Sequence, residues 1–294
     1  MKRAAILTVL LLAATATAAA LAPPQWERLG FGMRADNSGL HMSLPSIEPT
    51  ADEWRKLQAG EPITRLLDAP DGSKIATMRF FAPFDPVTAW MVVTDVEHYD
   101  LVDSLFSASG STLTKRHTLW PNAFENNVCV EQGRRRVSQL IVIPLVAPRK
   151  LCLSASYDAS AFPWEWHMDL AGVERCCASR SRPDVQDYFN KAVTPKRNRE
   201  SWFIAPLPPS LRKTPADALR TDCVYVADVN PGGELSQFEW LAKMAAAESL
   251  PQLARHIVAQ GKRWERFLTD HYDSAVVAAY RQHVAEYRNN ISAN

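Results

Sequence analysis

The amino-acid sequence predicts an α+β fold in which one large antiparallel sheet carries helices on one face. Strand-like patterns dominate residues 110–229, and the run 162–170 alternates apolar and polar residues with a period of two. A long helical pattern follows over residues 236–268. A sheet with one apolar face must bury that face against another layer, and we expect these helices to provide it.

Composition limits the function classes that fit the chain. It has 294 residues, 47% of them apolar and 22% charged, with a formal net charge of +1. Intrinsic disorder needs low hydrophobicity and a high net charge, so it is excluded over most of the length. The balanced charge also excludes a strongly basic nucleic-acid binder, because binding to phosphates relies on an excess of Lys and Arg.

The N-terminal segment has the layout of a secretory signal. Lys2 and Arg3 precede a short apolar run, and small residues in A-x-A patterns follow. We expect residues 1–22 to direct export to the periplasm or the exterior; an uncleaved N-terminal anchor is the alternative. Residues 23–49 are rich in Pro, Gly and Ser and should form an arm or linker ahead of the folded domain, which we place at residues 50–270.

Local signals mark the first elements of this domain. Thr50 and Glu53 form a capping box, which predicts a short helix after Thr50. The β-branched and aromatic run 74–81 predicts a strand. Asp85 followed by Pro86 predicts the start of a second helix. Asp can accept hydrogen bonds from the first free N–H groups, and Pro lacks the N–H that would otherwise go unpaired.

The run 162–170 is the clearest predicted strand. Its apolar face would consist of Phe162, Trp164, Trp166, Met168 and Leu170, whereas His167 should point to the opposite face. Further strands are expected at residues 128–131, 137–146, 151–155, 201–207 and 223–229. The aromatic face must be buried against something large. Two possibilities remain: an enclosed ligand buries it, or it packs directly on the long helix as an ordinary core.

The C-terminal part of the chain is predicted to be helical. Residues 230–233, Asn-Pro-Gly-Gly, form a turn ahead of the long helix. Pro251 lies inside that helix and predicts a kink or a break, because proline removes a backbone hydrogen bond. Residues 271–294 are expected to form a C-terminal helical tail.

The cysteines leave their pairing open. The five are Cys129, Cys152, Cys176, Cys177 and Cys223. An odd number leaves at least one unpaired or bonded to another chain. A disulfide is compatible with an exported chain, but its connectivity does not follow from the sequence. The Cys and His spacing matches no zinc motif, and we expect neither a metal nor a cofactor.

Several segments resemble, in the right order, the START-type lipid-binding domains of the helix-grip superfamily. The most specific are residues 224–233, Val-Tyr-Val-Ala-Asp-Val-Asn-Pro-Gly-Gly, and residues 245–251, Ala-Ala-Ala-Glu-Ser-Leu-Pro. They are similar to the family's last strand, its turn and the start of its C-terminal helix. Weaker matches are residues 54–60, 85–99, 144–149 and 200–207, of which the first two look like exported bacterial members.

The resemblance implies a helix-grip fold, in which a curved antiparallel sheet wraps around a long C-terminal helix and encloses an apolar tunnel. The cavity lining that it implies is Phe162, Trp164, Trp166, Met168, Trp202, Tyr225, Leu241, Met244 and Ala245. Glu131 and Arg149 are candidate polar groups in the cavity, or else members of a surface ion pair. Lys150 and Ala155 depart from the family, which has an acidic residue and often an arginine at these positions, so no headgroup contact can be carried over.

The sequence contains no recognisable catalytic set. It has no G-x-S-x-G motif, no phosphate-binding loop and no H-E-x-x-H motif. We therefore expect a monomeric protein that binds and transports a lipid or other large hydrophobic ligand, with transient contact to a membrane surface and none to nucleic acid. Basic clusters at residues 134–136 and 196–199 either touch anionic headgroups or lie in solvated turns. The alternative function is an enzyme on the same scaffold, such as a cyclase or hydratase; a third is a protein-interaction role without a ligand.

Overall fold

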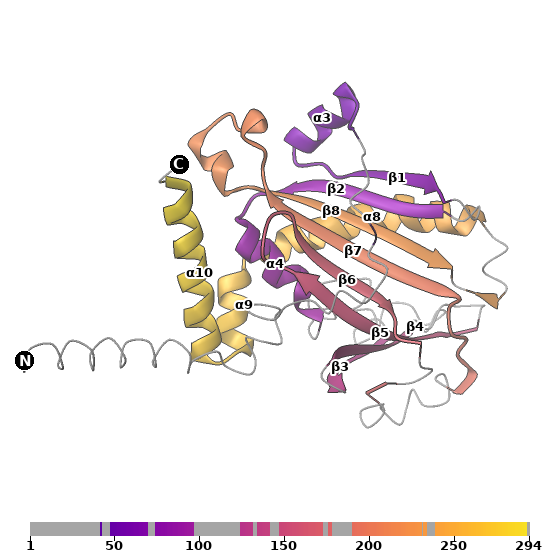
Figure 1. Cartoon of the computed structure of the whole chain (residues 1–294). Helices are drawn as coiled ribbons and strands as arrows, with labels where there is room; N and C mark the ends of the chain where they lie inside the picture. Colours follow the sequence, from indigo (N-terminus) through magenta and orange to yellow (C-terminus); the bar gives the residue numbers. More distant parts are fainter. Residues whose placement is uncertain are drawn as a thin grey trace, which may run out of the picture.

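A single curved sheet organises the molecule (Figure 1). The computed structural model describes residues 42, 48–69, 74–96, 124–131, 134–141, 147–172, 176–177, 190–230, 232–233 and 239–292. Within them, eight antiparallel strands lie in the order β1-β2-β8-β7-β6-β5-β4-β3. Helices α4 and α8 lie against one side of this sheet, which we call the inner face. The predicted helix-grip fold is confirmed.

The strands and helices have the following bounds. The strands are β1 (Ile63–Asp68), β2 (Lys74–Ala82), β3 (Phe124–Glu131), β4 (Arg134–Ile141), β5 (Arg149–Asp158), β6 (Trp164–Leu170), β7 (Arg197–Pro206) and β8 (Thr221–Asn230). The helices are α3 (Ala51–Gln58), α4 (Pro86–Thr94), α8 (Glu239–Gly261), α9 (Trp264–His271) and α10 (Ser274–Ser292). Two 3-10 helices, η4 (Pro209–Leu211) and η5 (Pro215–Leu219), lie between β7 and β8.

The two predicted helix starts are confirmed. The Glu53 backbone N–H donates to the Thr50 hydroxyl at 3.3 Å, and the Thr50 N–H donates back to the Glu53 carboxylate at 2.7 Å, which completes the capping box of α3. The Asp85 carboxylate accepts the Thr88 N–H at 2.9 Å, and Pro86 is the first residue of α4. Local chemistry therefore sets where both helices begin.

The outer face of the sheet carries its own smaller cluster beside α3. Leu57, Ile63 and Phe81 are buried there together with Leu207. The Arg79 guanidinium donates two hydrogen bonds to the Asp222 carboxylate, at 3.0 and 2.7 Å, on the same side. This layer fixes α3 to the sheet and leaves the inner face to the other helices.

Two disulfides join neighbouring parts of the outer face at the β3 end of the sheet. Cys129 of β3 is bonded to Cys177, and Cys152 of β5 is bonded to Cys176. The adjacent cysteines 176 and 177 thus tie together the two strands that flank β4. Cys223 is a buried free thiol, as the odd number of cysteines requires.

Several predicted boundaries need correction. Strand β6 begins at Trp164, so Phe162 precedes it; the intervening Pro163 has no N–H to give to a strand ladder. The structure describes β4 as far as Ile141, and residues 142–146 of the strand predicted at 137–146 lie outside the described residues. The predicted single helix over residues 236–268 is divided, because α8 ends at Gly261 and α9 follows.

Helix α8 runs through Pro251 without the predicted break. Residues on the C-terminal side of the proline, Ala254 and Ile257, are buried in the main core together with Leu250 before it. Tertiary packing on both sides of the proline can therefore hold the helix despite the missing hydrogen bond.

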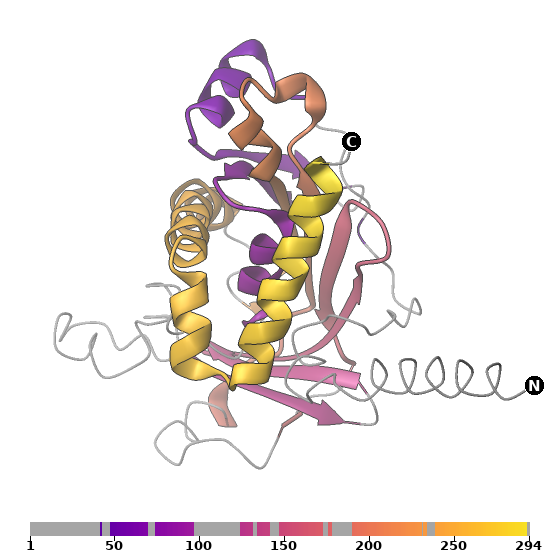
Figure 2. The same cartoon turned by 90° about the vertical axis from the view of Figure 1, so that its left-hand side faces the viewer.

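The predicted C-terminal tail belongs to the packed body of the molecule. Helix α10 contributes Val276, Val277, Tyr280 and Val284 to the main core. The Tyr280 and Thr88 hydroxyls are 2.9 Å apart, which ties α10 to the start of α4. Figure 2 shows α10 and α9 as adjacent helices at one end of the sheet. The expected signal, residues 1–22, lies outside the described residues, as does most of the arm at 23–49.

Candidate functional site

The inner face of the sheet is divided into rows of cross-strand neighbours. Close to α4, one row runs across five strands in direct register, and we call it the aromatic row. Its members are Met78, Tyr225, Trp202, Trp166 and Tyr157. The Tyr157 and Trp166 rings stack at 5.9 Å, and the Trp202 and Tyr225 rings lie 4.7 Å apart. All five residues are buried.

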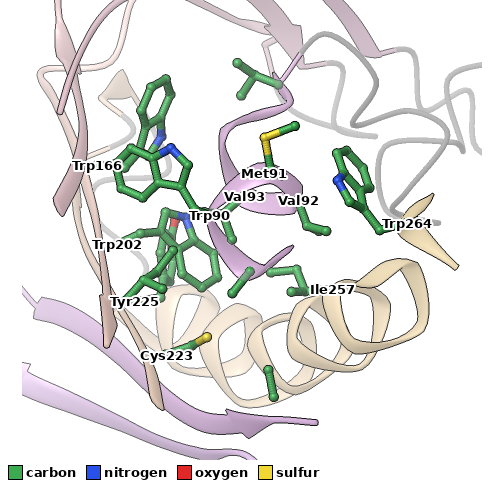
Figure 3. Packing of buried hydrophobic residues seen from close by; sticks show 14 of the residues in the cluster. Trp90, Met91, Val92, Val93, Trp166, Trp202, Cys223, Tyr225, Ile257 and Trp264 are labelled. Carbon is green, nitrogen blue, oxygen red and sulfur yellow. The ribbon is translucent and has the colours of Figure 1, made fainter. Parts of the chain in front are cut away.

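Helices α4, α8 and α9 close this half of the inner face (Figure 3). Trp90 of α4 meets the rings of Tyr157 and Trp164 edge-on at 6.2 and 5.7 Å. Ile257 of α8 and Trp264 of α9 are buried in the same cluster. Trp90 and Trp166 are both 0% exposed. This half has the dense packing of an ordinary protein core.

Two residues further along each strand, the inner face changes character. The next row in register, which we call the alanine row, consists of Leu66, Ala76, Ala227, Glu200, Met168 and Ala155. Three of the six are alanines, whose side chains occupy little space. Ala76, Ala155 and Glu200 remain partly exposed. The sheet is therefore less completely covered here than under α4.

The row beyond the alanine row is mixed, because Asn198 opposite Val229 and Leu153 opposite Leu170 are buried. Val229 of β8 is 39% exposed, although it shares the inner side of the strand with the buried Tyr225 and Ala227. Leu170 of β6 is partly exposed as well. We call the region from the alanine row to Val229 the open half of the inner face. Partly exposed apolar residues on a concave surface are typical of ligand-binding sites.

A polar cluster lies within the open half. Asn198 and Glu200 lie on the same side of β7 as the core residues Trp202 and Ile204, because strand side chains alternate. The Asn198 side-chain amide donates to Glu200 Oε1 at 2.9 Å. The Tyr225 hydroxyl forms a second hydrogen bond to the Glu200 carboxyl group. Burial raises the pKa of Glu200, and these two hydrogen bonds partly oppose that rise.

An arginine lies on the same face several strands away. Arg135 of β4 lies 5.4 Å from the centre of the Trp166 ring, and its guanidinium donates to the Thr94 carbonyl at 3.2 Å. Burial, Asn198 and Tyr225 account for the shifted pKa of Glu200 without a contribution from a cation. Asn198 and Tyr225 are the hydrogen-bond partners that the structure gives Glu200.

The structure places most of the predicted cavity residues on the inner face. Trp164, Trp166 and Met168 lie there on β6, and Trp202 and Tyr225 lie there on β7 and β8. Met168 and Tyr225 border the Glu200 cluster, whereas Trp166 and Trp202 lie in the closed half. Whether a ligand touches these residues stays a prediction.

The other predicted site residues divide into two groups. Phe162 is 43% exposed and stacks on Trp164 at 4.7 Å, at the rim near α10 rather than on the inner face. Arg149 is buried and donates to the Gly232 carbonyl at 3.0 Å, so it anchors the turn before α8. The side chains of Glu131, Leu241, Met244 and Ala245 lie outside the described residues.

Sequence reasoning missed Glu200 and Asn198. Residue 200 alternates with Trp202 and Ile204, which places its carboxyl group on their face, but the predicted strand began at residue 201 and left out positions 198 and 200. In the predicted basic cluster at residues 196–199, Arg197 and Arg199 pair with Asp228 and Asp169 on the opposite face, and contact with anionic headgroups stays a prediction.

A serine, a histidine and a glutamate align on the outer face. His167 Nδ1 lies 2.7 Å from the Ser201 hydroxyl, and His167 Nε2 lies 3.1 Å from the Glu165 carboxylate. The two strands bring His167 and Ser201 directly opposite each other. Ser201 is 2% exposed, so a substrate cannot reach its hydroxyl in this conformation. We interpret the three residues as a cross-strand hydrogen-bonded chain.

Two further properties concern only the described residues. They contain no group of three or more His, Cys, Asp or Glu residues arranged to hold a metal ion. None of the helices within them combines the length and the apolar character needed to cross a membrane.

Comparison with known proteins gives matches among solved structures only. No family model and no curated protein matches the chain. Human STARD10 has a TM-score of 0.47 at 12% identity, covering 76% of this chain and 84% of its own. The human StarD13 lipid transfer and protein localization domain has a TM-score of 0.42 at 9% identity, with coverages of 67% and 82%.

A bacterial structure has a similar score. The STAR-related lipid transfer protein from Xanthomonas axonopodis has a TM-score of 0.41 at 13% identity, covering 68% of this chain and 98% of its own. These chains are START-related lipid transfer domains. At such scores the likeness carries no weight for function, and the site is interpreted from this chain's own residues.

Proposed function

We propose that this chain binds a lipid or another large hydrophobic molecule against the open half of its inner face. The observation that carries the proposal is the contrast along one sheet face: Trp166 is 0% exposed in the aromatic row, whereas Val229 is 39% exposed beyond the alanine row. Leaving apolar surface open is unfavourable unless a partner covers it. An apolar guest that fills the space beside Ala76 and Ala155 would supply that cover.

The energetics favour a long-chain ligand. Each methylene that is removed from water contributes about 0.8 kcal/mol. Association costs on the order of 4–15 kcal/mol in lost freedom. A guest therefore needs a long apolar part to bind at all, and a few polar contacts then decide which guest binds best.

We further propose that the protein acts as a carrier outside the cytoplasm. The signal-like pattern of residues 1–22 supports export. The two disulfides support it as well, because structural disulfides persist mainly in oxidising compartments. A carrier must also meet a membrane to load and unload, and a monomer is sufficient for that task.

Filling the open half should block uptake. Ala155→Phe places a ring in the alanine row and should displace two or three methylenes of the ligand, which weakens binding about tenfold or more. The measurement is fluorescence titration with an uncharged apolar dye, and circular dichroism verifies the fold. Ala205→Phe is the matched control, because Ala205 is also partly exposed but faces the outer side beside Asp222. Equal dye affinity of both variants and the unchanged protein would contradict the proposal.

An enzymatic function on the same surface is the second candidate. It is favoured by one observation: Tyr225 is buried and converges with a carboxyl group of raised pKa, Glu200. An acid that stays protonated can donate a proton in catalysis. Turnover of a bound hydrophobic compound that is lost in Glu200→Gln, with binding retained, would distinguish this candidate from a carrier.

A further inference from the structure

Glu200 is an unusual residue for its surroundings. It is flanked in register by Met168 and Ala227 and lies next to Trp202 on the apolar side of β7. A carboxyl group in such a place costs free energy unless it is hydrogen-bonded or used. An aliphatic residue would pack there without that cost, so the position calls for a role in binding or chemistry.

The carboxyl group lies deep but is not sealed. Burial is the largest cause of its raised pKa, yet the residue keeps part of its surface exposed. A side chain can be both deeply buried and partly exposed when its exposed part faces the inside of a curved sheet rather than bulk solvent. We infer that this exposed part can be reached by a guest that lies along the alanine row.

The polar groups around Glu200 are uncharged. Among the described residues, Tyr225 is the titratable group that faces it from β8, and Asn198 is the amide that faces it from β7. Strands β6 and β2 present Met168 and Ala76 on this row. Arg135 of β4 lies on the same face but is directed to Trp166 and Thr94.

These contacts decide which headgroups fit. A neutral carboxylic acid offers one O–H donor and an acceptor, so it can pair with a hydroxyl or an amide. No cation among the described residues hydrogen-bonds to Glu200, so an anionic headgroup would meet a carboxyl group that none of them neutralises, at low local dielectric. A cationic headgroup would need the ionised carboxylate, which burial disfavours.

We propose that Glu200, held by Asn198 and Tyr225, selects hydrophobic ligands that carry an uncharged hydrogen-bonding group, a hydroxyl or an amide, over ligands with an anionic or cationic head. This inference rests on the proposed binding function and names the ligand class for that same surface. Glu200 acts as a specificity-determining residue that contacts the polar end of the ligand, while the apolar part lies along the alanine row.

The test uses three probes of equal chain length: dodecanol, dodecanoate and dodecylammonium. Each displaces an uncharged fluorescent dye from the full-length protein at neutral pH. We expect dodecanol to bind at least tenfold more tightly than either ion. Glu200→Gln, which keeps an uncharged hydrogen-bonding group, should retain dodecanol affinity within about threefold. Glu200→Leu should weaken dodecanol about tenfold or more while dye affinity is retained.

Each other outcome overturns a defined part of the account. Equal binding of the three probes, or unchanged dodecanol affinity in Glu200→Leu, overturns the role of Glu200 but leaves the binding function intact. A preference for dodecanoate or for dodecylammonium overturns the choice of an uncharged headgroup. Failure of the unchanged protein to bind the dye and all three probes overturns the proposed function itself. Glu165→Gln, on the outer face of β6, is the control for a surface carboxylate.

Discussion

Glu200 is the residue on which the ligand specificity depends, and its titration should be visible in stability. Burial raises its pKa in the folded protein above the value in the unfolded chain. Ionisation of this carboxyl group therefore does not stabilise the folded state. Its contribution to stability is complete below the unfolded pKa and is lost as the pH rises through the folded pKa.

Glu200→Gln should remove this loss. Ionising the buried carboxyl group lowers the stability of the unchanged protein, and Gln does not ionise, so we expect the variant to be the more stable of the two at about pH 8. Near about pH 3, below the ordinary pKa of glutamate, the group is protonated in both states and the two proteins should be similar. Urea unfolding of delipidated protein at both pH values measures the difference. An equal loss of stability in the variant at both pH values would argue against a buried acid.

At the residue scale, the sequence predicted which face of the sheet a side chain lies on better than it predicted what that side chain contacts. Alternation placed Trp166 and Met168 on the inner side and His167 on the outer side, and the structure agrees. Alternation could not show that the Arg149 side chain donates to the Gly232 carbonyl, because that hydrogen bond joins residues 83 positions apart. Such a pairing depends on how the chain closes in space.

At the scale of the elements, helix starts were predictable and strand ends were not. Asp85 and Thr50 carry their capping chemistry within three residues, so sequence alone contains the signal. The start of β7 depends on its partner strands, which no local pattern specifies. The same holds for the disulfides, because Cys152 and Cys176 meet only after β5 and the segment beyond β6 have come together.

The two disulfides should hold the β3 end of the sheet. They span 48 and 24 residues, and loops of this size contribute about 2–4 kcal/mol each to stability. Cys176→Ser and Cys177→Ser should each lower the free energy of unfolding by about this amount in thermal or urea denaturation under oxidising conditions.

Thiol titration provides the control for this prediction. In denaturant without reductant, the unchanged protein should expose a single reactive thiol, that of Cys223. Cys223→Ala should then expose none and should keep its sensitivity to reductant. A higher thiol count, or a melting temperature that reductant does not change, would contradict the pairing.

At the scale of the whole molecule, one sheet face serves two purposes. Its aromatic row packs against α4, α8 and α9 as a solid core. Its alanine row and the residues beyond it are left partly open. The sequence predicted an aromatic face that needs a cover but left open whether the cover is a ligand or a helix. The structure packs helices against the aromatic row, and we propose that the ligand lies on the neighbouring row.

Native mass spectrometry of the protein, exported into an oxidising compartment and purified without detergent, tests the central claim most directly. We predict an excess mass above that of the bare chain, removed by organic extraction and recovered as a lipid with an uncharged polar group. After extraction, the protein should regain an excess mass when incubated with lipid vesicles. A bare-chain mass in every preparation, with no uptake from vesicles, would contradict a ligand-binding inner face.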